Sequence, residues 1–233
     1  MTTTHSRPAA TDEALPISHP PTVSRAEWDA AWKQMLVKEK AHMRAGDALA
    51  AERRRMPWLS VDQDYEFEGP GGKVTLGDMF EGRRQLILYH FWFPEGGKPC
   101  VGCSMVGDQL TDVAHVNARD TTFAFVSRAP QADLRAFSQR MGWEIPWYTD
   151  TREFQEAYDT TEWFAFDVFL RDGDRAFQTY RTRGRGVEAI GTVWSLLDRT
   201  PLGRQEEWED TPPGRPQTPP YGWWNYHDEY GEG

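Results

Sequence analysis

The only two cysteines of the 233-residue chain, Cys100 and Cys103, are separated by two residues. They follow an apolar run, residues 86–93, which is broken by Pro94 and a glycine pair and leads into a helix-compatible segment. This pattern predicts a buried strand, a loop and a thiol at the start of a helix. Unpaired backbone NH groups and the helix dipole at such a position stabilise a thiolate, and they lower a cysteine pKa from about 8.5 to roughly 3.5–7.5. We therefore expect a dithiol/disulfide redox site.

The two thiols are expected to have different roles. Cys100 is predicted to be the nucleophile, because the first cysteine of such a loop lies at the exposed helix start. Cys103, one turn further on, is predicted to be the resolving thiol. Three other interpretations stay open: half of a zinc site, which would need two histidines as further ligands, a pair of inert buried cysteines, and a disulfide without catalytic function.

Four more residues are candidates for supporting roles. His90 ends the apolar strand and would lie under the cysteine loop if it shares a face with Leu86 and Leu88, the alternative being a buried histidine with its hydrogen bonds satisfied. Arg128 follows a second apolar run, at the strand end where ligands collect in open α/β sheets, and the alternative is an ion pair at a helix edge.

The other two candidates come from later in the chain. Trp143 is expected either to line a substrate groove or to pack in the core. Asp167 is a candidate base for proton transfer at Cys103, because a buried carboxylate near the site would have a raised pKa.

Composition restricts the partners. A hydrophobic content of 39% is enough for a sizeable core, and the formal charge of −10 argues against nucleic acid or an anionic membrane as a partner. No apolar segment of about twenty residues and no secretory signal is recognisable, so we expect a cytoplasmic protein. No cofactor and no metal are predicted, and the expected partner is a protein or small molecule that carries a disulfide or thiol. A homo-oligomer stays open.

The chain divides into three parts. Residues 1–22 predict a disordered arm, residues 23–205 a domain with an N-terminal helix, and residues 206–233 an extended segment, rich in aromatic residues and proline, that packs on the domain. The helix begins with a capping box from Ser24 to Glu27 and ends before Pro57.

Within the domain, periodicity predicts alternating strands and helices. The helix after Cys103 is expected to continue toward residue 117, and residues 121–126 form a second buried strand. A helix from Pro130 to Gly142 follows, and Asp172-Gly173 is a turn signal between the two strands of a hairpin. Residues 58–67 predict one strand, and residues 186–197 one helix. These elements predict an α/β fold with a central mixed sheet between two layers of helices.

The element order strand, Cys-x-x-Cys helix, strand, helix, hairpin, helix is that of thioredoxin-like domains. The chain also resembles a bacterial thioredoxin-like family known as a domain of unknown function, DUF899, whose members are often described as predicted dithiol-disulfide oxidoreductases. The matching strings are AAERRRMPW (50–58), YEFEGPGG (65–72), QLILYHFWF (85–93), CVGCS (100–104), VSRAPQADL (126–134), RMGWEIPW (140–147), RDGDRAFQTYRTRGRG (171–186), LLDRTPLGR (196–204) and HDEY (227–230).

The resemblance implies a thioredoxin-like fold and thiol redox chemistry without naming a substrate. The chain departs from thioredoxins in one respect: the proline that usually precedes their hairpin is absent from residues 165–168 (AFDV). Three alternative functions remain. One is a peroxiredoxin-like thiol peroxidase, although the PxxxTxxC signature is absent, and another is a Cu(I)- or zinc-binding thioredoxin-fold module without turnover, with His90 or another histidine among its ligands. The third is a fold that has lost its chemistry and is retained for partner binding.

Overall fold

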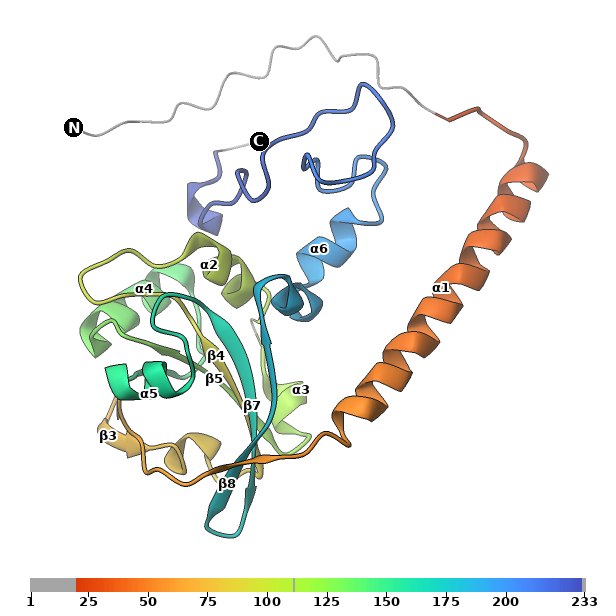
Figure 1. The fold of residues 1–233 in the computed structure, drawn as a ribbon. Helices are drawn as coiled ribbons and strands as arrows, with labels where there is room; N and C mark the ends of the chain where they lie inside the picture. The colour runs from red at the N-terminus through yellow and green to blue at the C-terminus, as the bar shows by residue number, and fades with distance from the viewer. Residues whose placement is uncertain (1–19, 111, 232–233) are drawn as a thin grey trace.

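The structure is a computed structural model that describes residues 20–110 and 112–231. Most of the predicted disordered arm, up to residue 19, lies outside the described residues. The described chain forms one sheet of eight strands in the order β1-β8-β7-β4-β5-β6-β2-β3, with helices on both faces (Figure 1).

Four strands form the centre of this sheet: β4 (Gln85–His90), β5 (Thr121–Ser127), β7 (Ala165–Asp172) and β8 (Arg175–Arg183). β4 and β5 are parallel, whereas β7 pairs antiparallel with both β4 and β8. The parallel pair is joined through the Cys-x-x-Cys helix, and the antiparallel pair is the predicted hairpin. The thioredoxin-like α/β fold with a mixed sheet is thereby confirmed.

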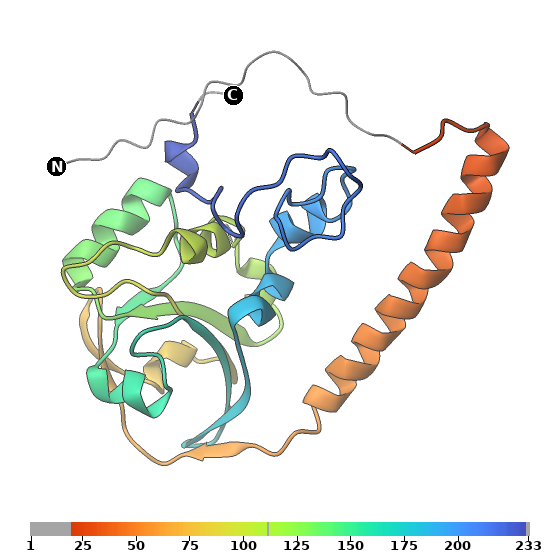
Figure 2. The ribbon, with the colours of Figure 1, turned by 45° about the horizontal axis from the view of Figure 1, so that its top comes forward.

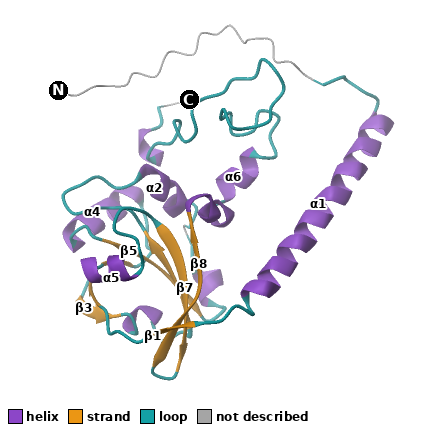
Figure 3. Cartoon of the chain, viewed as in Figure 1, coloured by secondary structure: helices purple, strands orange, loops and turns teal. Residues whose placement is uncertain are grey.

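The helices cover the two faces of the sheet unequally. Successive right-handed crossovers in one direction put α2 (Val101–Asp108) and α4 (Gln131–Met141) on the same face. The short helices η1 (Asp78–Phe80) and α5 (Arg152–Ala157) cover the opposite face, where Phe80 and Phe154 are fully buried (Figure 3).

The sheet is wider than the sequence predicts. The single strand expected at residues 58–67 is two strands, β1 (Leu59–Val61) and β2 (Glu66–Gly69), which lie toward opposite edges of the sheet. β2 forms a hairpin with β3 (Gly72–Thr75) and also pairs with β6 (Trp147–Thr149). Strands of three or four residues are too short to give a clear alternation, which is why the sequence pattern missed them.

Two predicted helices are interrupted. α2 ends at Asp108 and a separate turn, α3 (Ala114–Asn117), follows, while the predicted helix at residues 186–197 is a 3₁₀ helix, η2 (Gly184–Ile190), and then α6 (Thr192–Leu197). Gln109 connects the two segments at these breaks, because its side-chain carbonyl accepts a hydrogen bond from the backbone NH of Val193 in the first turn of α6 at 2.6 Å. The end of one helix therefore caps the start of the other.

Helix α1 (Arg25–Arg53) begins with the predicted capping box. The Glu27 carboxylate accepts a hydrogen bond from the backbone NH of Ser24 at 2.9 Å, and the Ser24 hydroxyl accepts one from the backbone NH of Glu27 at 3.4 Å. None of its residues is buried, and Trp28 and Trp32 stack on each other in solvent. Figures 1 and 2 show the helix standing clear of the sheet.

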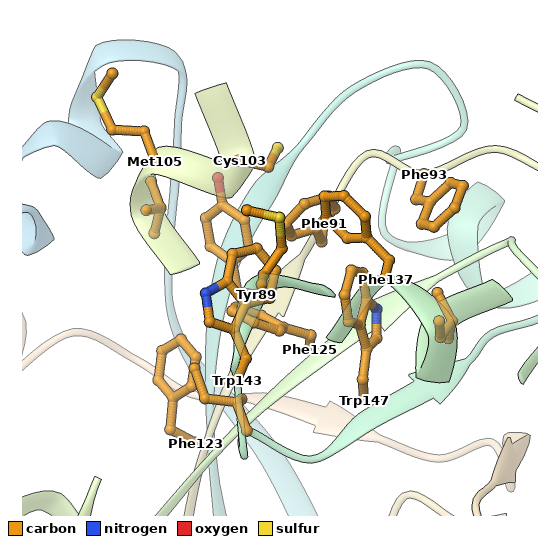
Figure 4. Packing of buried hydrophobic residues seen from close by; sticks show 14 of the residues in the cluster. Tyr89, Phe91, Phe93, Cys103, Met105, Phe123, Phe125, Phe137, Trp143 and Trp147 are labelled. Carbon is orange, nitrogen blue, oxygen red and sulfur yellow. The ribbon is translucent and has the colours of Figure 1, made fainter. Parts of the chain in front are cut away.

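The core consists of two clusters, one on each face of the central strands. Side chains alternate along β4, so Tyr89 and Phe91 belong to the cluster under α2, and Leu86 and Leu88 to the other. The first cluster is mostly aromatic, with Phe125 in edge contact with Tyr89, Phe91 and Trp147, among others (Figure 4). Each fully buried ring contributes about 1.5–3 kcal/mol from the burial of apolar surface.

A charged group is buried in the second cluster. Asp167 on β7 has no exposed surface, and its carboxylate lies 2.8 Å from Nε2 of His90 and 2.7 Å from Nε of Arg181. Burial would raise the pKa of Asp167, but the hydrogen bonds and charges of these two partners outweigh it and lower the pKa. The carboxylate is thus ionised in the folded protein and held by its partners.

We predict that Asp167→Ala lowers the free energy of unfolding by about 3–5 kcal/mol, because it removes the buried carboxylate that pairs with the guanidinium of Arg181 and with the buried ring of His90. Asp172→Ala is the matched control, since Asp172 lies on the same strand with an exposed side chain 3.7 Å from Arg175, and its loss costs at most about 1 kcal/mol. Urea denaturation measures both. Because the folded pKa of Asp167 is lowered, its contribution is present above the unfolded pKa of about 4 and is lost as the pH falls through the folded pKa. Equal unfolding energies for the two variants would contradict the prediction.

Candidate functional site

Cys100 occupies the N-cap of α2. The loop that leaves β4 turns back on itself, and the backbone NH of Cys100 donates to the carbonyl of Trp92 at 2.8 Å. Its backbone is still extended, so its side chain can cap the helix, and Sγ accepts a hydrogen bond from the backbone NH of Cys103 at 3.4 Å. The structure therefore places Cys100 at the start of the helix, with an amide directed at its sulfur.

The pKa values of the two thiols are shifted in opposite directions. The thiol of Cys103, which donates a hydrogen bond to the Cys100 sulfur, is the main cause that lowers the pKa of Cys100 from 9.0 to about 7, and the backbone NH groups of Cys103 and Gly102 lower it further against the effect of burial. Cys103 is buried, and burial together with the hydrogen bond to Cys100 and its charge raises the Cys103 pKa well above 9. At neutral pH a substantial fraction of Cys100 is therefore thiolate, whereas Cys103 stays protonated.

Tyr89 lies beneath this pair, and the sequence did not indicate it. Its ring is buried under α2 with the hydroxyl toward Cys103, as Figure 4 shows, and a hydrogen bond from that hydroxyl to the Cys103 sulfur partly offsets the raised pKa of the thiol. Burial also raises the pKa of Tyr89 itself, so the phenol stays protonated and donates. β4 is apolar on both faces, so its sequence gives no signal about which face meets the cysteines.

The C-terminal segment (residues 206–231) passes over α2 (Figures 1 and 2). The ring of Trp224 lies so close to Gly102 that a Cβ added there would be 2.4 Å from its Cζ3 atom. The hydroxyl of Tyr226 donates to the carbonyl of Pro99 at 2.6 Å, just before Cys100. The C-terminal segment thus contacts the backbone on both sides of Cys100, at Pro99 and at Gly102.

Ionic contacts and a buried carboxylate fix this segment. Arg140 on α4 pairs with Asp228 at 2.8 Å and with Glu229 at 2.7 Å. Earlier in the segment, the buried carboxylate of Glu206 accepts hydrogen bonds at 2.8 Å from both the indole NH of Trp223 and the backbone NH of Tyr221. These bonds hold the aromatic residues of the segment in place over the motif.

A pocket of about 440 Å³ opens beside Cys100. Its walls come from α2, from the residues that precede β7, from η2 and α6, and from the C-terminal segment, and most of the side chains are apolar. The lining residues are Tyr89, Cys100, Val101, Gly102, Cys103, Val106, Trp163, Phe164, Gly184, Arg185, Val187, Glu188, Trp194, Tyr221 and Trp224. A volume of this size falls within the range of small-molecule sites, roughly 300–1,000 Å³.

His90 and Asp167 lie apart from the cysteines. The condition that would put His90 under the cysteine loop, a shared face with Leu86 and Leu88, is met, but that face is the one turned away from α2. His90 stacks on Phe154 with ring centroids 5.5 Å apart and pairs with Asp167. The expected upward pKa shift of Asp167 is wrong, since the partners of this carboxylate lower its pKa.

Arg128 and Trp143 do not line the pocket. Arg128 donates to the carbonyl of Asp150 and lies 3.7 Å from the carboxylate of Glu95. Trp143 donates from Nε1 to Asp108 at 2.9 Å, and its ring packs so tightly against α2 that a Cβ on Gly107 would be 2.7 Å away. Trp143 therefore braces the helix that carries the cysteines.

The described residues, 20–110 and 112–231, contain no group of three or more His, Cys, Asp or Glu side chains arranged to hold a metal ion. His90, one of the histidines that a metal-binding module could use beside the cysteines, is paired with Asp167 on the other face of the sheet.

Residues 17–230 match the family model described as "Bacterial protein of unknown function (DUF899)". A search of curated proteins gives no significant match.

Several solved structures resemble the chain at low sequence identity. The thioredoxin domain of a thiol-disulfide oxidoreductase from Bacteroides vulgatus is 16% identical, with 60% of this chain and 98% of that one covered and a TM-score of 0.42. PrxQ from Xylella fastidiosa is 18% identical (57% and 89% covered, TM-score 0.39), and peroxidoxin BcpB from Mycobacterium tuberculosis is 13% identical (57% and 91% covered, TM-score 0.40). The fold assignment rests on the strand order and pairing given above.

We predict that Cys103→Ala raises the pKa of Cys100 from about 7 toward its ordinary value of 9.0, because it removes the thiol hydrogen bond that lowers the pKa most. Alkylation of Cys100 by iodoacetamide as a function of pH, followed by mass spectrometry, measures this pKa, since the rate rises as the thiolate forms with increasing pH. Tyr89→Phe is the control, because it leaves the Cys103 thiol in place and the profile near pH 7. A midpoint near 7 in Cys103→Ala would show that this bond is not the cause.

We also predict that Gly102→Ala displaces Trp224 and lowers the free energy of unfolding by about 1–3 kcal/mol through overpacking. Gly46→Ala is the control, because nothing lies within 4 Å of the added methyl group and alanine favours the helix by up to about 1 kcal/mol. Thermal and urea unfolding measure the difference. If Gly102→Ala is as stable as the parent protein, the contact between Trp224 and the motif is not formed in solution.

Proposed function

We propose that this chain, which belongs to the DUF899 family of bacterial proteins, is a thiol-disulfide oxidoreductase that uses Cys100 as nucleophile and Cys103 as resolving thiol. The observation that carries the proposal is the pairing of an N-cap sulfur, with a pKa of about 7, and a protonated thiol hydrogen-bonded to it. The optimum attacking thiol has a pKa near the ambient pH, because a substantial fraction of it is then thiolate and that thiolate is still strongly nucleophilic.

The first step is attack of the Cys100 thiolate on one sulfur of a substrate disulfide. A bond forms between Cys100 Sγ and that sulfur, the substrate S–S bond breaks, and the other half leaves as a thiolate. The backbone NH groups of Gly102 and Cys103 and the thiol of Cys103 hold the Cys100 sulfur ready for this reaction.

The second step is resolution by Cys103. Burial still raises the pKa of Cys103 at this stage, but the hydrogen bond to the Cys100 thiolate and its charge, which raise this pKa further, are gone, so the proton of Cys103 is more easily lost to the departing thiolate. Cys103 then attacks the Cys100 sulfur, the mixed disulfide breaks, and the second half of the substrate leaves. Two electrons have passed from the dithiol to the substrate, and an external dithiol restores the starting state.

Tyr89 assists the resolving thiol in this scheme. Its hydroxyl donates to Cys103 from below, and this hydrogen bond lowers the Cys103 pKa. The bond favours the thiolate of Cys103, which is the form that must attack in the second step. Tyr89 is therefore a positioning residue for Cys103.

The expected partner is a molecule that carries a disulfide or thiol. The cytoplasmic location stays a prediction, and a homo-oligomer stays open. No helix in the described part of the chain is both long enough and apolar enough to cross a bilayer.

We predict that the wild-type protein catalyses reduction of bis(hydroxyethyl) disulfide with dithiothreitol as electron donor. Cys100→Ser is expected to lower the rate to that of dithiothreitol alone, because it removes the nucleophile. Cys103→Ser, incubated with the disulfide in the absence of dithiothreitol, is expected to accumulate a mixed disulfide on Cys100, visible by mass spectrometry as the added half of the substrate. Turnover that survives in Cys100→Ser, or an inactive wild type, would refute the mechanism.

Hydrogen peroxide in place of the disulfide separates this function from the thiol peroxidase alternative. We expect slower turnover with peroxide than with the disulfide. The opposite ranking, together with a sulfenic acid on Cys100 in Cys103→Ser, would favour the peroxidase.

A further inference from the structure

We propose that the substrate is a small, uncharged organic disulfide with apolar substituents, bound in the pocket beside Cys100. This inference rests on the proposed function and adds the substrate class. The walls of the pocket, the charges at its rim and the position of the C-terminal segment support it separately.

The walls are made of aromatic and aliphatic side chains on several sides of the Cys100 sulfur. Trp163 and Phe164 stack on each other with centroids 5.4 Å apart, and Phe164 stacks in turn on Tyr89 at 6.5 Å. Trp194 and Trp224 also line the pocket, and their rings pack edge to face with centroids 6.1 Å apart. An apolar substituent placed there is removed from water against faces and edges of aromatic rings, which favours binding by roughly 25 cal/mol per Å² of apolar surface buried.

The two charged side chains that line the pocket, Arg185 and Glu188, form an ion pair with each other. Arg185 Nε lies 3.1 Å from the carboxylate of Glu188, and Arg204 approaches the same carboxylate at 2.8 Å. Arg204 is itself bonded to Asp198 at 2.6 Å, and the Arg185 guanidinium lies over the ring of Trp208. A carboxylate or ammonium group of a substrate would therefore lose its water shell in this pocket without gaining a counter-charge. This disfavours cystine and glutathione disulfide.

The position of the C-terminal segment disfavours a protein substrate. Trp224 covers Gly102, and Tyr226 is bonded to Pro99, so this segment lies against the backbone on both sides of Cys100. A polypeptide that carried its disulfide to Cys100 would have to displace this segment and break the Arg140 pairs that hold it. A small molecule needs only the pocket of about 440 Å³.

The experiment compares four disulfides on the wild-type protein with dithiothreitol as donor: dibenzyl disulfide, bis(hydroxyethyl) disulfide, glutathione disulfide and insulin. Each rate is divided by the rate of dithiothreitol alone with the same substrate, so that intrinsic reactivity cancels. We expect kcat/KM for dibenzyl disulfide to exceed that for each of the other three by roughly tenfold or more, the discrimination that a hydrophobic pocket achieves over one or two apolar groups.

A pair of tryptophan variants tests where this preference arises. Trp163→Ala removes a rim side chain that is 58% exposed, and we expect it to lower kcat/KM for dibenzyl disulfide roughly fivefold through KM, with little effect on bis(hydroxyethyl) disulfide. Trp28→Ala is the matched control, because Trp28 is 53% exposed on α1 and lies outside the pocket. It is expected to change neither rate.

The outcomes separate the two proposals. Equal or faster turnover of glutathione disulfide or insulin would overturn the substrate class and leave the oxidoreductase function standing. A wild type that reduces none of the four disulfides above the rate of dithiothreitol alone would overturn the function itself, and the substrate class with it. A preference for dibenzyl disulfide that is lost in Trp163→Ala and kept in Trp28→Ala supports both.

Discussion

The chemistry that this fold can perform depends on the hydrogen bonds that converge on the sulfur of Cys100. They come from a backbone amide of the first helical turn and from the thiol of the residue that closes the motif. Both donors are in place because β4 ends at His90, the backbone NH of Cys100 is hydrogen-bonded to the carbonyl of Trp92, and α2 begins at the next residue, Val101. The parallel sheet, the crossover and the aromatic core beneath α2 keep this helix start fixed relative to the buried Cys103.

The C-terminal segment shapes what can reach that sulfur. Trp224 and Tyr226, from the C-terminal part of the sequence, lie against Gly102 and Pro99 at the start of α2. The carboxylate of Glu206 is buried and accepts hydrogen bonds from an indole NH and a backbone NH of the C-terminal segment. These bonds hold the segment in the folded structure. Reactivity is therefore set by local hydrogen bonds, and access by contacts between residues more than a hundred positions apart.

Much of this could be predicted from the sequence, and the exceptions have physical reasons. The Cys-x-x-Cys helix, the two parallel strands, the capping box at Ser24 and the hairpin at Asp172-Gly173 are local patterns, and each is present. The role of Tyr89 and the face of His90 could not be predicted, since a strand that is apolar on both sides does not reveal which side meets a helix. The contact of Trp224 with Gly102 is likewise a tertiary fact, although the cluster of aromatic residues near the C-terminus indicated a segment with surface to bury.

The alternation of side chains along β4 also places the cysteine site and the buried Asp167 ion pair on opposite faces of the sheet. Tyr89 points to the thiols, and the next residue, His90, points to the ionised Asp167 on the opposite face. A sheet of close-packed aromatic and branched side chains lies between the two groups, and no hydrogen bond between described residues links them. The carboxylate that the sequence suggested as a base is therefore an element of the core, held ionised by its partners. In the proposed mechanism the proton of Cys103 passes to the departing substrate thiolate, which is consistent with the opposite pKa shifts of the two thiols.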